Sequence, residues 1–399
     1  VIPDNSNQRK KMKQTILFKH PAPVYRAALK DDFDLADFDL ESGAPPDDIR
    51  RSRNGRIMRR LDAMIIDEVS MVRSDLMWAI DQSLRVNRGR PREAFGGVRM
   101  ILFGDLFQLP PVVREGEEAT YLEDQYGGPY FFSVPALAES PGTHLLELEQ
   151  VFRQTDNELV DILNAIRSGV AGEAELAQLN QRVAPIRTLS EGLSVVILTP
   201  TNAAANRINR AYLDALPSQG FEFEAGITGD FNESAQPTEA RLELKEGAKV
   251  ILLRNDPDRR WVNGTIATIS RLTDSRVWIE HGGREYELEP VAWENRRYAF
   301  DQAEDKIVES VAGTFRQFPL RLAWALTIHK SQGLTLEDVY VDFGRGTFAH
   351  GQAYVALSRC RSLDGLRLAR PLKPWDVKFD PRAAEYERVF TRIDGGGGA

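Results

Sequence analysis

The chain has 399 residues, of which 42% are hydrophobic and 28% charged, a composition typical of globular proteins with enough apolar surface for two or three cores. Its net charge of −8 and pI of about 5.4 argue against a protein that holds nucleic acid through a global basic field. A groove with local cations remains compatible with this charge. The sequence has neither an apolar run of roughly 18 residues, as a membrane span requires, nor the apolar stretch of a secretory signal near its start.

The single cysteine, Cys360, excludes an internal disulfide and fits a reducing compartment. Its apolar surroundings, YVALSRC, are typical of a small buried thiol rather than a catalytic one. We therefore expect an intracellular protein in a bacterial-type cytoplasm, with the nucleus or a mitochondrion as alternatives.

Residues 1–60 are heterogeneous in charge. An acidic run at 31–48 precedes the segment 50–60, RRSRNGRIMRR, which contains six arginines. Both runs are compatible with solvated helix faces and a loop, and the arginines also with a DNA contact.

From residue 60 onward, short apolar runs alternate with segments of helical periodicity. The runs AMIIDEVSM, VRMILFGD and SVVILTPTN predict strands buried on both faces, as in a parallel sheet. Residues 74–88 and 157–169 have helical spacing of apolar side chains, and Gly169 is a predicted helix stop. This alternation predicts an α/β fold.

The pattern changes over residues 241–300. Asn263-Gly264 and His281-Gly282-Gly283 lie between runs rich in β-branched and aromatic residues, which predicts antiparallel hairpins. The α/β pattern resumes near residue 320. The charged, helix-like segment 380–399, which ends in GGGGA, is predicted to be a frayed tail.

Two strand ends carry the first chemical signal. Asp67-Glu68 follows one predicted buried strand; Gly104-Asp105 follows another, with Gln108 in the next loop. Ligands of α/β proteins gather at such strand ends. Asp67 is predicted to hold the magnesium ion of a nucleotide, Glu68 to deprotonate a water, and Gln108 to sense the terminal phosphate. The alternatives are a helix N-cap for the acidic pair and a solvent-facing glutamine.

The segments containing these residues, IIDEVSMV and FGGVRMILFGDLFQLPPV, resemble the Pif-type DNA helicases, relatives of RecD within superfamily 1. Four further segments resemble the same family, in family order. They are LEQVFRQTDNELVDILNAIRSG, LTPTNAAANRIN, GAKVILLRNDPDRRWVNGT and FPLRLAWALTIHKSQGLTLEDVYVDFGRGTFAHGQAYVALSRCRS. The resemblance is dense from about residue 60 to 375.

This resemblance implies an α/β fold of two RecA-like P-loop-NTPase domains with ATP and Mg²⁺ between them. The implied division is a truncated first domain over 1–145 with an accessory wedge near 20–56, a second domain over 146–240 and 315–378, an inserted small antiparallel β-barrel over 241–314, and a tail over 379–399. The implied partners are single-stranded and forked duplex DNA, with 5′→3′ travel.

The resemblance also implies roles for individual residues. Arg153 and Arg359 match arginines that reach the nucleotide from the second domain. Out of this context, a surface salt bridge would be the preferred interpretation of either arginine. The implied nucleotide-contacting residues are Gly104, Asp105 and Gly333, and the implied DNA-contacting residues are Thr201, Asn202, His329, Lys330, Ser331 and Gln332.

Several of these residues have structural alternatives. Thr201 and Asn202 are also suited to capping a helix, and His329 to a core position. In TIHKSQG, a helix start after a strand suits a phosphate. Trp261 is compatible with stacking on a base or with packing in a core.

One family feature is missing. A P-loop requires GxxxxGK[ST], and the sequence contains no Gly-Lys dipeptide. Gln14-Thr15-Ile16 is a weak match to a family segment that follows that loop. We therefore expect an N-terminally incomplete or split helicase, with the loop supplied by an upstream segment or a separate chain, in preference to a decayed relative. Unless residues 1–20 or a partner replace the missing central strand, we expect an unpaired sheet edge and poor stability.

Two rival functions stay open. A non-catalytic DNA-binding remnant of a helicase is favoured by the missing loop and disfavoured by the retained acidic and arginine sites. The second rival is a different P-loop enzyme, such as a nuclease-linked ATPase. It is disfavoured because the sequence shows no cluster of nuclease-like carboxylates.

Overall fold

The computed structural model describes residues 16–19, 55–113, 116–138, 143–148, 151–186, 188, 195–301, 306–389 and 391–392. The predicted wedge near 20–56 lies almost entirely outside these residues, as do the acidic run and residues 50–54 of the arginine-rich segment. None of the helices in the described ranges combines the length and the apolar character that a membrane span needs.

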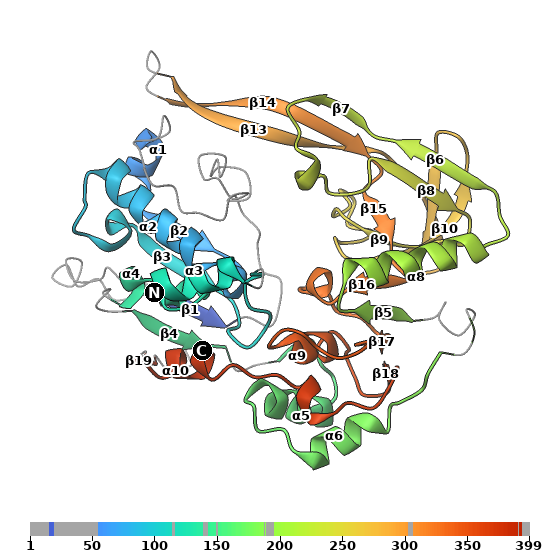
Figure 1. Ribbon diagram of the computed structural model, residues 1–399. Coiled ribbons are helices and arrows are strands. Elements are labelled where there is room, and N and C mark those ends of the chain that lie inside the picture. Colours follow the sequence, from blue (N-terminus) through green and yellow to red (C-terminus); the bar gives the residue numbers. More distant parts are fainter. Residues whose placement is uncertain are drawn as a thin grey trace, which may run out of the picture.

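A five-stranded parallel sheet forms what we call the first lobe, at the left of Figure 1. Its strands, in spatial order, are β19 (Thr391–Arg392), β4 (His144–Glu147), β1 (Ile16–Lys19), β3 (Arg99–Phe103) and β2 (Ala63–Ile66). Its helices are α1 (Gly55–Arg60), α2 (Ser74–Arg88), α3 (Glu117–Tyr126), α4 (Pro135–Ala138) and, from the far end of the chain, α10 (Pro381–Val389).

The strands β2 and β3 correct one expectation. They were predicted to be buried on both faces, but burial alternates along each, and Ile65 of β2 is 46% exposed. The edge position of β2 accounts for the exposure of Ile65, whereas β3 is an inner strand whose less buried residues are mostly intermediate. Parallel pairing, in contrast, is confirmed throughout this sheet.

The centre of the first sheet is occupied by β1. It pairs in parallel with β3 on one side, Leu17 opposite Leu102, and with β4 on the other, Leu17 opposite Leu145. Residues 16–19 thus take the central place that the sequence left without a strand. The expected unpaired edge beside β3 is absent from the described structure, and the expected instability no longer follows from it.

A second parallel sheet forms the second lobe. Its strands, in spatial order, are β16 (Ala325–Thr327), β5 (Val196–Thr199), β17 (Val339–Val341) and β18 (Leu366–Leu368). Its helices are α5 (Asn157–Arg167), α6 (Glu173–Asn180), α8 (Asn202–Ala215) and α9 (Gln352–Leu357). All four residues of β5 are buried, as predicted for this strand.

Local sequence explains α5 well. The Asp156 side chain accepts hydrogen bonds from the backbone N–H groups of Glu158 and Leu159 at the helix start, and Gly169, with φ of 72°, follows its end. Leu159, Ile162, Leu163 and Ile166 are buried at helical spacing.

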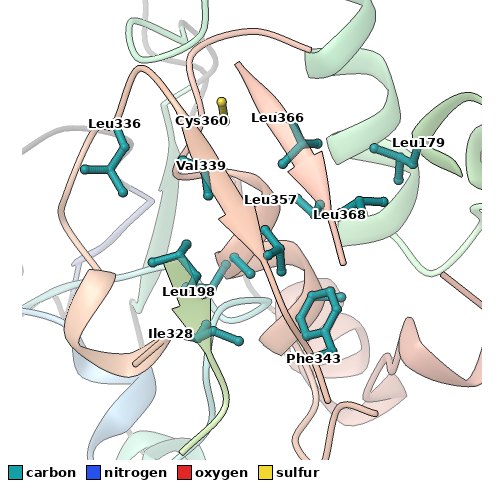
Figure 2. Packing of buried hydrophobic residues seen from close by; sticks show 14 of the residues in the cluster. Leu179, Leu198, Ile328, Leu336, Val339, Phe343, Leu357, Cys360, Leu366 and Leu368 are labelled. Atoms are coloured by element: carbon teal, nitrogen blue, oxygen red, sulfur yellow. The ribbon is translucent and has the colours of Figure 1, made fainter. Parts of the chain in front are cut away.

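The core of the second lobe packs leucine, isoleucine and valine side chains from strands, helices and loops around the sheet. Figure 2 shows Leu198, Val339 and Leu366 from three of the strands beside Leu357 of α9. Cys360 is fully buried in the same cluster as a free thiol, which confirms the structural interpretation of this residue.

The remaining strands are antiparallel. One sheet has the order β12 (Arg284–Leu288), β11 (Val277–His281), β10 (Ile266–Leu272), β9 (Lys249–Leu252) and β15 (Leu320–Leu322). Two smaller sheets are formed by β13 (Val291–Asp301), β14 (Lys306–Gln317) and β7 (Gly226–Gly229), and by β6 (Gly220–Glu224) and β8 (Arg241–Lys245).

Both predicted hairpins are confirmed. His281 pairs with Arg284 across the two-residue turn Gly282-Gly283, whose φ angles are 60° and 72°, and β9 pairs with β10 across the loop containing Gly264. The predicted closed barrel is wrong. In the described residues the five-stranded sheet is open, with β12 and β15 at its edges, and the long β13–β14 hairpin extends away from it across the top of Figure 1.

The helix-like character of the last segment is confirmed by α10, but this segment is not frayed over residues 381–389 and 391–392. The segment 374–392, which we call the C-terminal strap, leaves the second lobe and ends in the first. There β19 pairs in parallel with β4, and Tyr386 of α10 lies against the aromatic rings of Phe131 and Phe132. Apolar contacts made by aromatic side chains, invisible in the charged composition of the segment, hold it in place.

Candidate nucleotide cleft and DNA-contact surface

The acidic pair lies where the sequence predicted, directly after β2. Glu68 adopts the left-handed conformation, with φ of 51°, and its backbone N–H donates to Asp67 Oδ1 at 2.9 Å. A non-glycine residue in this region is uncommon, and such residues cluster at functional sites. The helix-cap alternative is not supported, because no side-chain cap hydrogen bond forms at the following 3-10 turn.

The environment of Glu68 favours a proton acceptor over a permanently charged surface residue. Its side chain is accessible to solvent, yet protein atoms surround it on most sides. This partial burial, and then the charge of Asp67, raise the pKa of the Glu68 carboxyl above its ordinary value, whereas Arg359 and Arg153 act in the opposite direction. A carboxyl with a raised pKa is a common feature of catalytic bases.

The second strand end packs closely against the first. A Cβ on Gly104 would lie 3.1 Å from Val69 Cγ1 and 3.2 Å from the Val69 backbone nitrogen. Glycine therefore allows the end of β3 to approach the turn that follows Glu68. Asp105 accepts from the Phe107 N–H at 3.1 Å and from Gln108 Nε2 at 3.4 Å, which orients the loop containing Gln108.

Both predicted arginines come from the second-lobe part of the chain and act on Glu68. Arg153 is partly buried, and its Nε donates to Thr335 Oγ1 at 3.2 Å. Burial lowers its pKa, and Glu68 opposes this shift. The guanidinium forms no salt bridge to a carboxylate among the ion pairs of the described residues, which disfavours the alternative of a surface ion pair.

Arg359 is held more rigidly. Its side chain is 1% exposed, and its three nitrogens donate to Val355 O at 2.9 Å, Ser331 O at 3.5 Å and Ser358 Oγ at 2.8 Å. Burial lowers its pKa to about 9, and repulsion from Arg153 adds to the shift. The group stays charged at neutral pH, and its acceptors are all neutral oxygens. A buried cation of this kind is suited to an anion.

One inter-lobe contact was not predicted from the sequence. Arg167, at the end of α5, donates from Nε to Asp105 Oδ1 at 3.3 Å, lies 4.0 Å from Glu147 Oε1 and places its guanidinium 4.6 Å from the ring centroid of Phe107. Tyr354 of α9 also interacts with Asp105 through its hydroxyl. A basic residue in the last turn of a helix is common, so Arg167 gave no distinguishing signal.

The segment TIHKSQG differs from the expectation of a helix start. After β16 it forms a single 3-10 turn, His329–Ser331, in which the Lys330 N–H donates to Thr327 Oγ1 and the Ser331 N–H to Ile328 O. Ser331 is fully buried, and its hydroxyl donates to the same carbonyl at 2.8 Å. This corrects the expectation that Ser331 faces a phosphate.

The other residues of this segment are accessible to different degrees. Lys330 and Gly333 are exposed; His329 is half-buried and stacks on the exposed ring of Phe348, with centroids 6.4 Å apart and planes inclined by 14°. Gln332 Nε2 donates to Gln108 Oε1 at 3.4 Å, which joins this turn to the loop after β3.

The remaining predicted DNA contacts separate into two groups. Thr201 and Asn202 are exposed at the start of α8, where Thr201 Oγ1 accepts from the Ala204 N–H at 3.2 Å. The capping interpretation of Thr201 is thus confirmed, and its exposure leaves a DNA contact open. Trp261 is 7% exposed and packs on Tyr286 and under Arg260, so it belongs to a core and not to a stacking platform.

The donor set suits a nucleotide-bound magnesium ion better than a resident metal. No cluster of three or more metal-binding side chains occurs within the described ranges. Mg²⁺ in nucleotide sites usually takes one or two carboxylates and completes its shell with phosphates and water. The exposed Asp67 carboxylate fits that requirement.

Sequence comparisons identify a family to which the chain is similar. The sequence signature of PIF1-like helicases matches residues 47–172. "ATP-dependent DNA helicase Pif1" of Bdellovibrio bacteriovorus is 32% identical over 363 residues, which cover 89% of this chain and 77% of the relative. The human "ATP-dependent DNA helicase PIF1" is 34% identical over 337 residues, covering 82% of this chain and 49% of the relative, so the chain spans about half of the human protein.

Solved structures confirm the expected fold class, α/β with two RecA-like domains. Pif1 of Bacteroides sp in complex with ADP-AlF4 superposes with a TM-score of 0.75 at 30% identity, over 96% of this chain and 88% of that one. Bacteroides Pif1 in complex with ADP-AlF3 and single-stranded DNA gives a TM-score of 0.64 at 29% identity, over 98% and 97%. The chain belongs to the PIF1-like family of ATP-dependent DNA helicases.

Proposed function

We propose that this chain is the motor part of an ATP-dependent DNA helicase that moves along single-stranded DNA and separates the duplex ahead. The observation that carries the proposal is electrostatic. Arg153 and Arg359 act on the Glu68 carboxylate from elements of the other lobe. Acidic groups on one wall and guanidinium groups on the other are what phosphoryl transfer between two domains requires.

Each wall has a distinct task in this proposal. Asp67 would hold the magnesium ion of the nucleotide, which would supply positive charge to offset that of the phosphates. Glu68 orients a water and accepts its proton, a role that its raised pKa supports. Gln108 contacts the terminal phosphate, with Gly104, Asp105 and Gly333 shaping the surrounding backbone.

The arginines stabilise charge that builds on the transferring phosphoryl group. Arg359 is preorganised, because its nitrogens are fixed by neutral acceptors, whereas Arg153 is anchored by Thr335. A planar guanidinium can contact two phosphate oxygens at once, which an ammonium does less well. Contributions of 10³–10⁵ in rate are typical of arginines with this role.

The proposed DNA contacts form a surface on the second lobe. Thr201 and Asn202 at the start of α8, and His329, Lys330 and Gln332 after β16, follow two neighbouring strands of one sheet, β5 and β16. Lys330 is the exposed cation of the group. A structure of Bacteroides Pif1 with single-stranded DNA, and one of two coordinating Pif1 helicases that unwind forked duplex DNA, support both partners.

A second candidate is favoured by a specific observation. The sequence has no Gly-Lys dipeptide and therefore no GxxxxGK[ST] loop to cradle phosphates. A chain that binds single-stranded DNA without hydrolysing ATP would be a non-catalytic member of the family.

The deciding experiment measures two properties of the same preparation. Binding is followed by the fluorescence anisotropy of a labelled oligo(dT), and ATP hydrolysis is measured with and without that oligonucleotide. DNA-stimulated hydrolysis supports the motor; binding without hydrolysis supports the non-catalytic alternative. Absence of both overturns the assignment of a DNA-contact surface.

A further inference from the structure

Among the described glycines, Gly351 is the one at which an added Cβ would lie closest to backbone atoms of the other lobe. It precedes α9, its φ is 70°, and it lies against the backbone carbonyls of Phe107 and Gln108 in the loop after β3. A Cβ at this position would lie 2.3 Å from Gln108 O and 2.5 Å from Phe107 O. A hydrogen atom is therefore the largest substituent that fits.

A side chain here would have to move one lobe away from the other. A carbon atom normally stays roughly 3.5 Å from a non-bonded neighbour, so the lobes would separate by about 1 Å. The obstructing atoms are backbone carbonyls, which cannot rotate aside as a flexible side chain can. The loop that bears them is itself fixed, because Asp105 accepts from the Phe107 N–H and from Gln108.

Polar contacts surround this point and come from both lobes. Arg167 of α5 lies on Asp105, Glu147 and the ring of Phe107, all in the first lobe. Tyr354, one turn along α9 from Gly351, interacts with the same Asp105. In addition, the Gly351 N–H donates to Lys378 O of the C-terminal strap at 3.2 Å.

The same helix connects this contact to the proposed cleft. The α9 helix begins at Gln352, directly after Gly351, and ends at Leu357; Ser358 and Arg359 follow. Arg359 donates from Nε to Val355 O within that helix. A displacement of the start of α9 from the first lobe therefore moves Arg359 relative to Glu68.

We propose that Gly351, together with the Arg167–Asp105 contact, is the joint that sets the width of the cleft between the lobes, and that Gly351 is a positioning residue for Arg359. Its importance for catalysis rests on the proposed function. The geometric claim, that the residue at 351 fixes the spacing of the lobes, can be tested without nucleotide.

The chain offers a matched control. Gly344 has a φ of 57°, close to that of Gly351, but a Cβ there meets no atom within 4 Å. Gly351→Ala and Gly344→Ala therefore share the backbone strain of a left-handed alanine. Only Gly351→Ala also introduces the contact with the other lobe.

The first measurement is the distance between spin labels at Arg92→Cys in the first lobe and Arg207→Cys in the second, both exposed positions, in the full chain. Cys360 is buried and can remain. Gly351→Ala is expected to shift the mean distance by about 1 Å or more, the displacement that the added carbon demands, and Gly344→Ala to leave it unchanged. An unchanged distance in Gly351→Ala, or equal shifts in both variants, overturns the proposal.

A second variant covers the case in which Gly351→Ala does not fold. Arg167→Gln removes the ion pair with Asp105 without adding volume and is expected to broaden the distance distribution. An unaltered distribution in this variant counts against the joint.

The second measurement is steady-state ATP hydrolysis with single-stranded DNA. A misplacement of about 1 Å can cost roughly 100-fold in rate, so Gly351→Ala is expected to lower kcat by that order with little change in KM, while Gly344→Ala keeps wild-type kinetics. A higher KM with an unchanged kcat contradicts the positioning role. If the unmodified chain does not hydrolyse ATP, the catalytic form of the proposed function fails, and the distance measurement still decides whether the joint exists.

Discussion

The ring of Tyr386 in α10 stacks on the ring of Phe132 in the first lobe, with centroids 4.1 Å apart and planes inclined by 15°. Phe131 meets the same tyrosine edge-on at 5.9 Å. Together with the pairing of β19 and β4, this contact makes the end of the C-terminal strap part of the first lobe.

We predict that Tyr386→Ala lowers the free energy of unfolding by about 3 kcal/mol, as for other large aromatic residues removed from packed sites. Denaturant unfolding measures this change. Glu385→Ala, at the neighbouring exposed position, is the control, since surface substitutions usually change the free energy of unfolding by no more than about 0.5 kcal/mol. Equal effects of the two substitutions would show that the strap does not stabilise the first lobe.

A buried ion pair holds the strap at its other end. Asp376 is fully buried and accepts from Arg370 at 2.8 Å through both oxygens. We predict that Asp376→Ala destabilises the chain by about 3 kcal/mol, because it leaves a partly buried guanidinium without its partner. Asp364 also pairs with an arginine, Arg182, but is 92% exposed, and Asp364→Ala should cost about 0–1 kcal/mol.

The same pair has a pH signature. Although burial opposes it, the hydrogen bonds from Arg370 lower the pKa of Asp376 below its ordinary value. The stabilisation is therefore complete above the ordinary pKa of an aspartate and is lost as the pH falls through the lowered one. The difference in stability between wild type and Asp376→Ala should shrink on acidification; a difference that grows would contradict the assignment.

For the proposed base, we predict that Glu68→Gln retains nucleotide but lowers ATP turnover at least ~100-fold, the usual contribution of general base catalysis. Turnover by the hydrolysing form of the enzyme and binding of a fluorescent nucleotide are the measurements. Glu173→Gln, at an exposed glutamate of α6, is the control. Turnover within threefold of the parent would refute the role of Glu68.

Glu68→Gln also has an expected effect on stability that is independent of turnover. Burial and Asp67 raise the pKa of Glu68, so the folded state binds its proton more tightly than the unfolded state does. Ionisation then costs stability as the pH rises from the ordinary glutamate pKa through the raised one. The variant should melt at a higher temperature than wild type at pH 7, and the two should converge near pH 4.

For the DNA-contact surface, we predict that Lys330→Ala weakens binding of single-stranded DNA and reduces the slope of log affinity against log salt by about 0.7, the value for one phosphate contact on a single strand. Lys373→Ala serves as the control, because Lys373 is exposed just before the C-terminal strap, where its ammonium group lies over the ring of Trp375. An unchanged slope would remove Lys330 from the proposed surface.

Local patterns were sufficient for much of the fold. The apolar run of β5, the aspartate and glycine at the two ends of α5, and the Gly282-Gly283 turn each act within a few residues, so their consequences appear in the sequence directly. Asp67, Glu68, Arg153 and Arg359 could likewise be singled out, because each stands in a distinctive segment, and their roles stay predictions.

Only the tertiary structure decided which distant segments meet. Burial along β2 follows from its place at a sheet edge, the central place of β1 from pairing with β3 and β4, and the docking of α10 from contacts with rings more than two hundred positions earlier. Gly351 and Arg167 look like an ordinary turn glycine and an ordinary helix-end cation. Their importance comes from contacts with residues of the other lobe. A local sequence pattern does not reveal such contacts, because the two partners are far apart in the sequence.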